Sequence, residues 1–131
     1  KVIANATGSL ITGNQLGETE SRMDFNVPEF NREIAEKYVQ QANEVIAQHL
    51  AITTDFLQYV EAILKPELFR LKDVLPKNVP QIRVVSIGNF DIQADGGTHV
   101  KNTNEIGMLK LLKIENKGKE NRRMYWTLES K

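Results

Sequence analysis

The chain has 131 residues, the length of one ordinary domain. It contains no cysteine, which excludes disulfides and thiolate metal ligands, and its 17 basic and 17 acidic side chains argue against a strongly basic nucleic-acid binder. No apolar run approaches the roughly 20 residues of a spanning helix, and no signal peptide is recognisable, so we expect a cytoplasmic protein without a membrane partner.

The first elements that the sequence predicts are a short helix and a strand pair. The chain begins at Lys1 inside an amphipathic pattern that has no capping residue before it. We therefore expect residues 1–7 to be a helix that lacks its start, in a chain truncated at its N-terminus. Residues 8–30 are glycine-spaced and then alternate around Met23, which predicts a turn-rich strand pair ending at Pro28.

A long amphipathic helix is expected next. In residues 31–50 apolar side chains recur every three or four positions behind Asn31, a natural N-cap, which predicts a helix of about five turns. Residues 51–57 are compatible with a short strand. The apolar pattern of residues 57–70 predicts a second helix, interrupted at Pro66.

Strands dominate the second half of the chain. After a loop bracketed by Pro76 and Pro80, the β-branched residues 81–88 predict a strand. Residues 89–94 alternate apolar and polar side chains, so Asp95 is expected on the polar side at the end of that strand.

Residues 106–116 and 122–129 predict two further strands, joined by a glycine-containing connection of hairpin length. Helices come first, strands gather late, and the loops are too short for parallel crossovers. We therefore expect a single α+β domain over residues 1–131, with two layers in which helices pack on a largely antiparallel sheet.

Charge is distributed unevenly along this neutral chain. Residues 1–60 carry four basic and eight acidic side chains, whereas residues 101–123 carry seven basic and three acidic ones. The basic run from Lys113 to Arg123 could therefore contact phosphates of a nucleic acid. A solvated hairpin explains the same run at least as well.

One stretch, "ADGGTHVKNTNEIG" at residues 94–107, concentrates residues suited to chemistry. Its central cluster is Asp95, Gly96, Gly97, Thr98 and His99. The two glycines remove side chains beside two potential ligands, so backbone N–H groups can approach a bound anion or carbonyl closely. A plain tight turn, in which Thr98 and His99 satisfy loop hydrogen bonds, is the alternative.

"GGTHV" followed by "KNTNEIG" resembles the signature of the alanyl-tRNA editing domain family, Cys-Gly-Gly-Thr-His-Val followed by a Thr and by Glu-Ile-Gly or Asp-Ile-Gly. The "GGTHV" wording favours the alanyl over the related threonyl editing domains. The resemblance continues in "SRMDF" (residues 21–25), "ELFRLKDVLP" (67–76) and "IENKGKENRR" (114–123), and so covers nearly the whole chain in the family's order.

This resemblance implies the editing-domain fold and an aminoacyl-tRNA deacylase. Such an enzyme hydrolyses the ester that joins a wrong amino acid, serine or glycine, to the tRNA for alanine. The length of the chain favours a free-standing protein that edits in trans. An editing domain excised from an alanyl-tRNA synthetase, and a non-catalytic RNA-binding module with the same fold, are the alternatives.

The family's zinc site combines a His-x-x-x-His pair on the first helix with the Cys and His of the signature. In this sequence the pair would lie just upstream of Lys1, and Asp95 stands where the family has its Cys, four residues before His99. Aspartate is a legitimate zinc ligand. The resemblance therefore implies Asp95 and His99 as metal ligands, with weak or absent zinc binding in the chain as given. A turn-capping carboxylate is the other interpretation of Asp95.

Ester hydrolysis needs a placed water, a polarised carbonyl and a stabilised oxyanion. Zinc could supply the first two, and the backbone N–H groups of Gly96 and Gly97, next to Thr98, could contribute to the third. Gly97 and its neighbours are therefore candidate catalytic residues. The metal could instead mainly position the substrate, with a substrate hydroxyl assisting the reaction.

Family members line their amino-acid pocket with the glycine-spaced segment, so the resemblance makes Gly13, Asn14 and Gln15 candidate substrate-binding residues. Thr103, downstream of the signature, is a further candidate. A plain turn for the first three residues, and a loop-fixing role for Thr98 and Thr103, are the alternatives. For Arg22 and Asp24 we favour a structural ion pair. His49 is expected to end the long helix, where a cationic side chain interacts favourably with the helix dipole.

Overall fold

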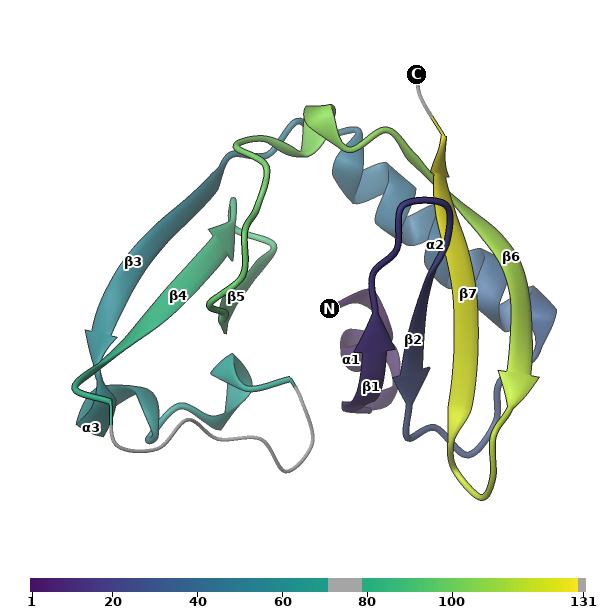
Figure 1. Ribbon diagram of the computed structural model, residues 1–131, viewed down its shortest axis with the longest axis horizontal. Helices are drawn as coiled ribbons and strands as arrows, with labels where there is room; N and C mark the ends of the chain where they lie inside the picture. Colours follow the sequence, from purple (N-terminus) through teal and green to yellow (C-terminus); the bar gives the residue numbers. More distant parts are fainter. Residues whose placement is uncertain (71–78, 130–131) are drawn as a thin grey trace.

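The computed structural model describes residues 1–70 and 79–129 and contains two antiparallel sheets. The four-stranded sheet has the order β1 (Ile11–Gln15), β2 (Ser21–Phe25), β7 (Arg122–Glu129), β6 (Met108–Asn116). The three-stranded sheet has the order β3 (Ile52–Gln58), β4 (Gln81–Ile87), β5 (Asp91–Ala94). The α+β class and the antiparallel pairing are confirmed. The strands, however, divide between two sheets that stand on opposite sides of the molecule and are joined at one end (Figure 1).

Two helices pack on the four-stranded sheet. Helix α1 (Val2–Thr7) contacts helix α2 (Arg32–Ile46), which lies against β6. The predicted N-cap of α2 is confirmed, since Asn31 Oδ1 accepts a hydrogen bond from the Ile34 N–H at 2.9 Å. No helix in the described part of the chain combines the length and apolar character that crossing a membrane requires.

The prediction that α2 continues to His49 is wrong. The helix ends at Ile46, whose carbonyl accepts a hydrogen bond from the Thr103 hydroxyl at 2.9 Å. His49 lies three residues beyond the helix with a φ of 54°, in the left-handed region. The chain reverses here to enter β3, so His49 is part of a connection rather than of the last helical turn.

The predicted second helix over residues 57–70 is also largely wrong. Only α3 (Tyr59–Ala62) and a 3₁₀ turn, η1 (Pro66–Leu68), are helical. Leu57 belongs to β3, where it pairs with Ile82, and the residue before Pro66 is kept out of the helical region by the proline ring. Pro76 and the part of "ELFRLKDVLP" from residue 71 onward lie outside the described residues.

Each sheet has its own buried apolar cluster. On the three-stranded sheet the cluster consists of Ala62, Leu68, Ile82 and Val84. On the four-stranded sheet two clusters lie under α1 and α2, formed by Ile3, Phe25 and Val27 and by Ala35, Val39 and Leu111. The buried apolar core is therefore divided between the two sheets.

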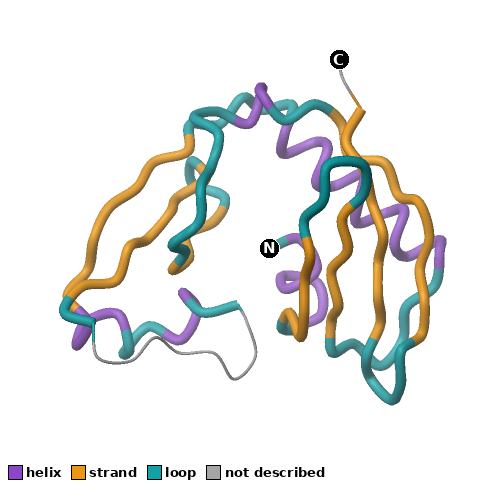
Figure 2. The backbone as a smooth tube through the Cα atoms, viewed as in Figure 1, coloured by secondary structure: helices purple, strands orange, loops and turns teal. Residues whose placement is uncertain are grey.

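A cavity of about 360 Å³ lies between the two sheets, with a lining drawn from both of them. Its apolar residues include Phe25 and Ile87, whereas Asp91 and Gln93 contribute polar groups from β5. Figure 2 shows the two sheets facing each other across this space. The predicted alternation of residues 89–94 is therefore present, but its polar side faces inward, while Ile92 is 43% exposed.

Candidate functional site

The predicted chemical cluster forms a loop that leaves the three-stranded sheet after β5. The Asp95 N–H donates to the Arg83 carbonyl at 3.1 Å, which extends the pairing of β4 and β5 by one residue. The Asp95 Oδ1 atom then accepts the Gly97 N–H at 2.7 Å. An aspartate that accepts the N–H two residues ahead closes an Asx turn. The turn reverses the chain at the point where the sheet ends.

This turn brings Asp95 and His99 together. His99 Nε2 lies 3.1 Å from Asp95 Oδ2, and the two side chains are 26% and 34% exposed. One carboxylate oxygen is thus held by a backbone N–H, and the other faces the imidazole. Both donor atoms predicted to bind metal are adjacent and accessible from solvent.

The two glycines of the turn have different surroundings. The Gly97 N–H is engaged by Asp95, whereas no acceptor in residues 1–70 and 79–129 receives the Gly96 N–H. A Cβ atom at Gly97 would lie 3.0 Å from Asp95 Oδ1, but a Cβ at Gly96 would meet nothing within 4 Å. Of the two N–H groups predicted to stabilise an oxyanion, the one on Gly96 is the more available. Thr98 is exposed beside them.

The side chain of Arg83, on β4, stabilises the turn through hydrogen bonds. Its Nη1 donates to the carbonyl oxygens of Asp95 at 3.0 Å and of Gly97 at 2.6 Å. The interpretation of the sequence missed Arg83. Its β-branched neighbours indicate a strand, but no local pattern indicates that its side chain reaches a loop 12 to 14 residues further on.

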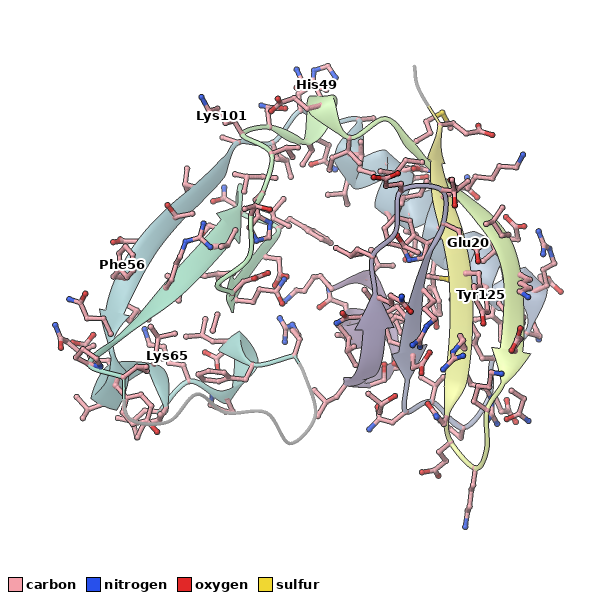
Figure 3. All side chains as sticks on the ribbon, viewed as in Figure 1. Glu20, His49, Phe56, Lys65, Lys101 and Tyr125 are labelled. Carbon is pink, nitrogen blue, oxygen red and sulfur yellow. The ribbon has the colours of Figure 1, made fainter. Side chains whose placement is uncertain are left out.

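The far end of the loop is anchored by Thr103, which is 3% exposed. Its hydroxyl donates to the Ile46 carbonyl and accepts the Leu50 N–H, both at 2.9 Å. Both hydrogen-bonding directions are therefore used within the protein, which agrees with a loop-fixing role more than with substrate binding. Figure 3 labels His49 and Lys101 at this junction, where the two sheets are joined.

The other predicted substrate-binding residues, Gly13, Asn14 and Gln15, lie on β1 at the edge of the four-stranded sheet. A Cβ at Gly13 would lie 3.4 Å from Asp24 Oδ2, an ordinary contact distance. Gln15 Oε1 accepts a hydrogen bond from Arg22 Nε at 3.3 Å. Among the described residues, none of the three forms a hydrogen bond to the 95–101 loop, so their role in binding stays a prediction.

Asp24 is a buried structural anion of the four-stranded sheet. It is 7% exposed and accepts two hydrogen bonds from Arg123 on the neighbouring strand, with Nε at 2.8 Å and Nη2 at 3.1 Å. Arg22, on the same strand as Asp24, approaches at 3.6 Å. The hydrogen bonds that Arg123 donates to the Asp24 carboxylate raise the pKa of Arg123 above its ordinary value.

The predicted basic run is largely engaged in local contacts. Lys113 and Lys117 contact Glu115 at 3.1 and 2.6 Å, and Lys113 also lies 4.5 Å from the centre of the Tyr125 ring. Figure 3 labels Tyr125 on β7. Hydrogen bonds from Lys117 and then Lys113 lower the pKa of Glu115, and its carboxylate raises the pKa of Lys113. Arg122 donates to the Pro28 carbonyl at 2.6 Å. These contacts favour the solvated hairpin over a phosphate-binding run.

Asp95 and His99 fit half of a zinc site. Within residues 1–70 and 79–129 no third His, Cys, Asp or Glu joins them in a group that could hold a metal. Two ligands of one tetrahedral zinc ion lie about 3.3 Å apart, given bonds of about 2.0–2.1 Å. The separation of 3.1 Å between His99 Nε2 and Asp95 Oδ2 is compatible with that spacing and is also that of a direct contact between imidazole and carboxylate.

Comparison with known proteins places the loop in a family. Residues 82–125, from β4 into β7, match the family described as the threonyl and alanyl tRNA synthetase second additional domain. The alanyl-tRNA editing protein AlaX-M of Saccharolobus solfataricus is 42% identical over 93% of this chain and 51% of its own length. AlaX-M of Methanosarcina barkeri is 43% identical over 97% of this chain and 53% of its own. The chain belongs to the alanyl-tRNA editing family.

Membership of the editing family confirms the resemblance inferred from "GGTHV" and its ordered context. The chain spans about half the length of the AlaX-M relatives that it matches. The alanine–tRNA ligase of Thermococcus kodakarensis is 36% identical over 79% of this chain, which corresponds to 11% of that enzyme. The chain is thus similar both to alanyl-tRNA editing proteins and to a short segment of a much larger ligase.

Proposed function

We propose that the 95–101 loop belongs to the active site of a deacylase that edits mischarged tRNA for alanine in trans. Its substrate would be the tRNA for alanine that carries serine or glycine. Hydrolysis of the ester bond would release the free amino acid. The observation that carries the proposal is the Asp95–His99 pair, 3.1 Å apart, in the family's signature loop. The similarity to the AlaX-M relatives, which are named alanyl-tRNA editing proteins, supports it.

Asp95 and His99 are proposed to hold a zinc ion, with further ligands from the His-x-x-x-His pair that the resemblance puts upstream of Lys1. A bound zinc ion would supply a water whose pKa is lowered to near 7. The hydrogen bond from the Gly97 N–H to Asp95 Oδ1 supports this assignment, because partners of this kind orient metal-binding carboxylates. The Asp in place of the family's Cys would make this an oxygen-containing variant of the site.

The glycine turn is proposed to receive the ester. The Gly96 N–H is the better placed donor for the oxyanion, since the Gly97 N–H already binds Asp95. Without a side chain at Gly96, the carbonyl of the substrate can approach the backbone closely. Thr98, exposed beside the turn, is the adjacent hydroxyl, and Gly13, Asn14 and Gln15 remain the candidates for recognising the amino acid.

A free-standing cytoplasmic enzyme is favoured over a synthetase fragment. The identity to the AlaX-M proteins is 42–43% over more than nine-tenths of this chain, compared with 36% over 79% for the Thermococcus ligase. The higher identity and the fuller coverage of this chain both support editing in trans.

The proposal is tested with the full-length protein and with tRNA for alanine charged either with serine or with alanine. We expect hydrolysis of the serine ester and retention of the alanine ester. The His99→Asn variant should lose at least a hundredfold in rate, whereas His49→Asn should not, since His49 lies outside the loop and Asn tolerates its positive φ.

Loss of neither ester, or equal loss of both, would refute editing by this protein. Tight binding of the tRNA with neither ester hydrolysed would instead support the non-catalytic RNA-binding module. Equal rates of hydrolysis in the two histidine variants would show that His99 is not part of the active site, but would not contradict the editing activity itself.

A further inference from the structure

Arg83 makes three hydrogen bonds to the turn that carries the candidate ligands. Its carbonyl oxygen accepts the Asp95 N–H at 3.1 Å. Its Nη1 donates to the carbonyl oxygens of Asp95 at 3.0 Å and Gly97 at 2.6 Å. The backbone and side chain of one strand residue therefore hold both ends of the Asp95–Gly97 turn.

The two carbonyl groups converge on one guanidinium nitrogen. Oxygen atoms aimed at the same point carry like partial charges and repel each other unless a cation lies between them. An arginine Nη bears two hydrogen atoms, one for each carbonyl, and hydrogen bonds from an ionised donor are stronger than neutral ones. The charged Arg83 side chain therefore stabilises the turn in addition to the hydrogen bond within the loop.

The same conformation orients the Asp95 carboxylate. Through the Asp95 and Gly97 carbonyls, Arg83 holds the two peptide groups on either side of the one that carries the Gly97 N–H. That N–H donates to Asp95 Oδ1, which leaves Oδ2 to face His99 Nε2. The described contacts of Arg83 reach only backbone carbonyls and not the Asp95 carboxylate. Arg83 can thus orient the carboxylate without competing for its oxygens.

We propose that Arg83 is a positioning residue that holds Asp95 and His99 in register and so sets the affinity of this pair for a divalent metal ion. The proposal deepens the proposed function, because it rests on Asp95 and His99 acting as metal ligands. Hydrogen-bonding partners that orient metal ligands typically change metal affinity by 10- to 100-fold.

The test compares Arg83→Gln with Arg32→Gln in the full-length protein. Arg32 is a matched control, since it also donates to two backbone carbonyls, those of Leu111 and Leu112, but between α2 and β6. Zinc affinity is measured by competition with a chromophoric chelator. We expect Arg83→Gln to weaken zinc binding at least tenfold, Arg83→Lys to recover part of the loss, and Arg32→Gln to change nothing. Unchanged zinc affinity in Arg83→Gln would overturn the proposal.

A second measurement does not depend on metal. In the metal-free protein, the Gly97 amide should exchange with solvent faster in Arg83→Gln than in the parent or in Arg32→Gln, because its hydrogen bond to Asp95 is loosened. Unaltered exchange at Gly97 would refute positioning by Arg83, whatever the zinc result. Faster exchange in Arg83→Gln, together with a parent protein that binds no zinc, would instead refute the proposed metal site and support the role of Arg83 in orienting the turn.

Discussion

The two glycines of the signature loop offer a sharp test, since they are neighbours with opposite surroundings. The change is Gly97→Ala, with Gly96→Ala as its matched control. A Cβ at Gly97 would lie 3.0 Å from Asp95 Oδ1, which is shorter than the ordinary contact distance of 3.4–4 Å. A Cβ at Gly96 would meet nothing within 4 Å. Neither glycine has a positive φ, so backbone strain does not enter the comparison.

The expected effect follows from the hydrogen bond that the new methyl group disturbs. To restore ordinary contact, the Asp95 carboxylate must move by about 0.4 Å or more, away from the Gly97 N–H that it accepts at 2.7 Å. A hydrogen bond to a charged group contributes about 1.5–3 kcal/mol. Because the carboxylate is 34% exposed and can rotate, we expect the lower end, about 1.5 kcal/mol, which is roughly a tenfold loss of metal affinity.

The assay is zinc affinity of the full-length protein by chelator competition, followed by hydrolysis of the serine ester. Gly97→Ala should weaken zinc binding about tenfold, and Gly96→Ala should leave zinc binding unchanged. Gly96→Ala should still slow hydrolysis, because its methyl group blocks close approach of the substrate carbonyl. Equal zinc affinities in the two variants would show that the orientation of Asp95 does not control the site.

Two further predictions concern stability. Thr103→Val keeps the buried volume but leaves the Ile46 carbonyl and the Leu50 N–H without their partner, so the free energy of unfolding in urea should fall by about 2–4 kcal/mol. The exposed Thr98→Val should change that free energy by less than about 0.5 kcal/mol, and a similar loss in both would contradict the assignment. Lys117 and Lys113 lower the pKa of Glu115 below its ordinary value of 4.5, so its stabilising contribution is complete above that pH and is lost as the pH falls through the lowered pKa. Glu115→Gln should therefore have a lower Tm than the parent at pH 7 and a smaller Tm difference at pH 3, and a difference independent of pH would refute the ion pairs.

Local patterns predicted most of the elements correctly. Alternation and turn residues located the strands of the second half, and Asn31 located the start of α2. The helix predicted over residues 57–70 failed because its first residues pair with β4, and such tertiary pairing overrides a weak local preference. The division into two sheets was missed, since it depends on which distant strands pair.

The distinction between local patterns and contacts between distant segments also separates the parts of the site that were predicted from those that were missed. Asp95 and His99 are four residues apart within one loop, so a local signature could suggest their proximity. Arg83 acts from a different strand, and the Thr103 hydroxyl reaches a carbonyl 57 residues earlier in the chain. Contacts of this kind leave no periodic trace in a single sequence.

The strand order of the four-stranded sheet has a consequence for synthesis of the protein. Strand β2 pairs with β7, and 99 residues separate Asp24 from its partner Arg123. The β1–β2 hairpin emerges from the ribosome early, but two strands alone are marginally stable in water. The edge of β2 that pairs with β7 must therefore wait until residues 122–129 have been translated. We expect slow folding of this sheet and a need for protection of the nascent chain, because pairing between distant segments delays folding and exposes apolar surface.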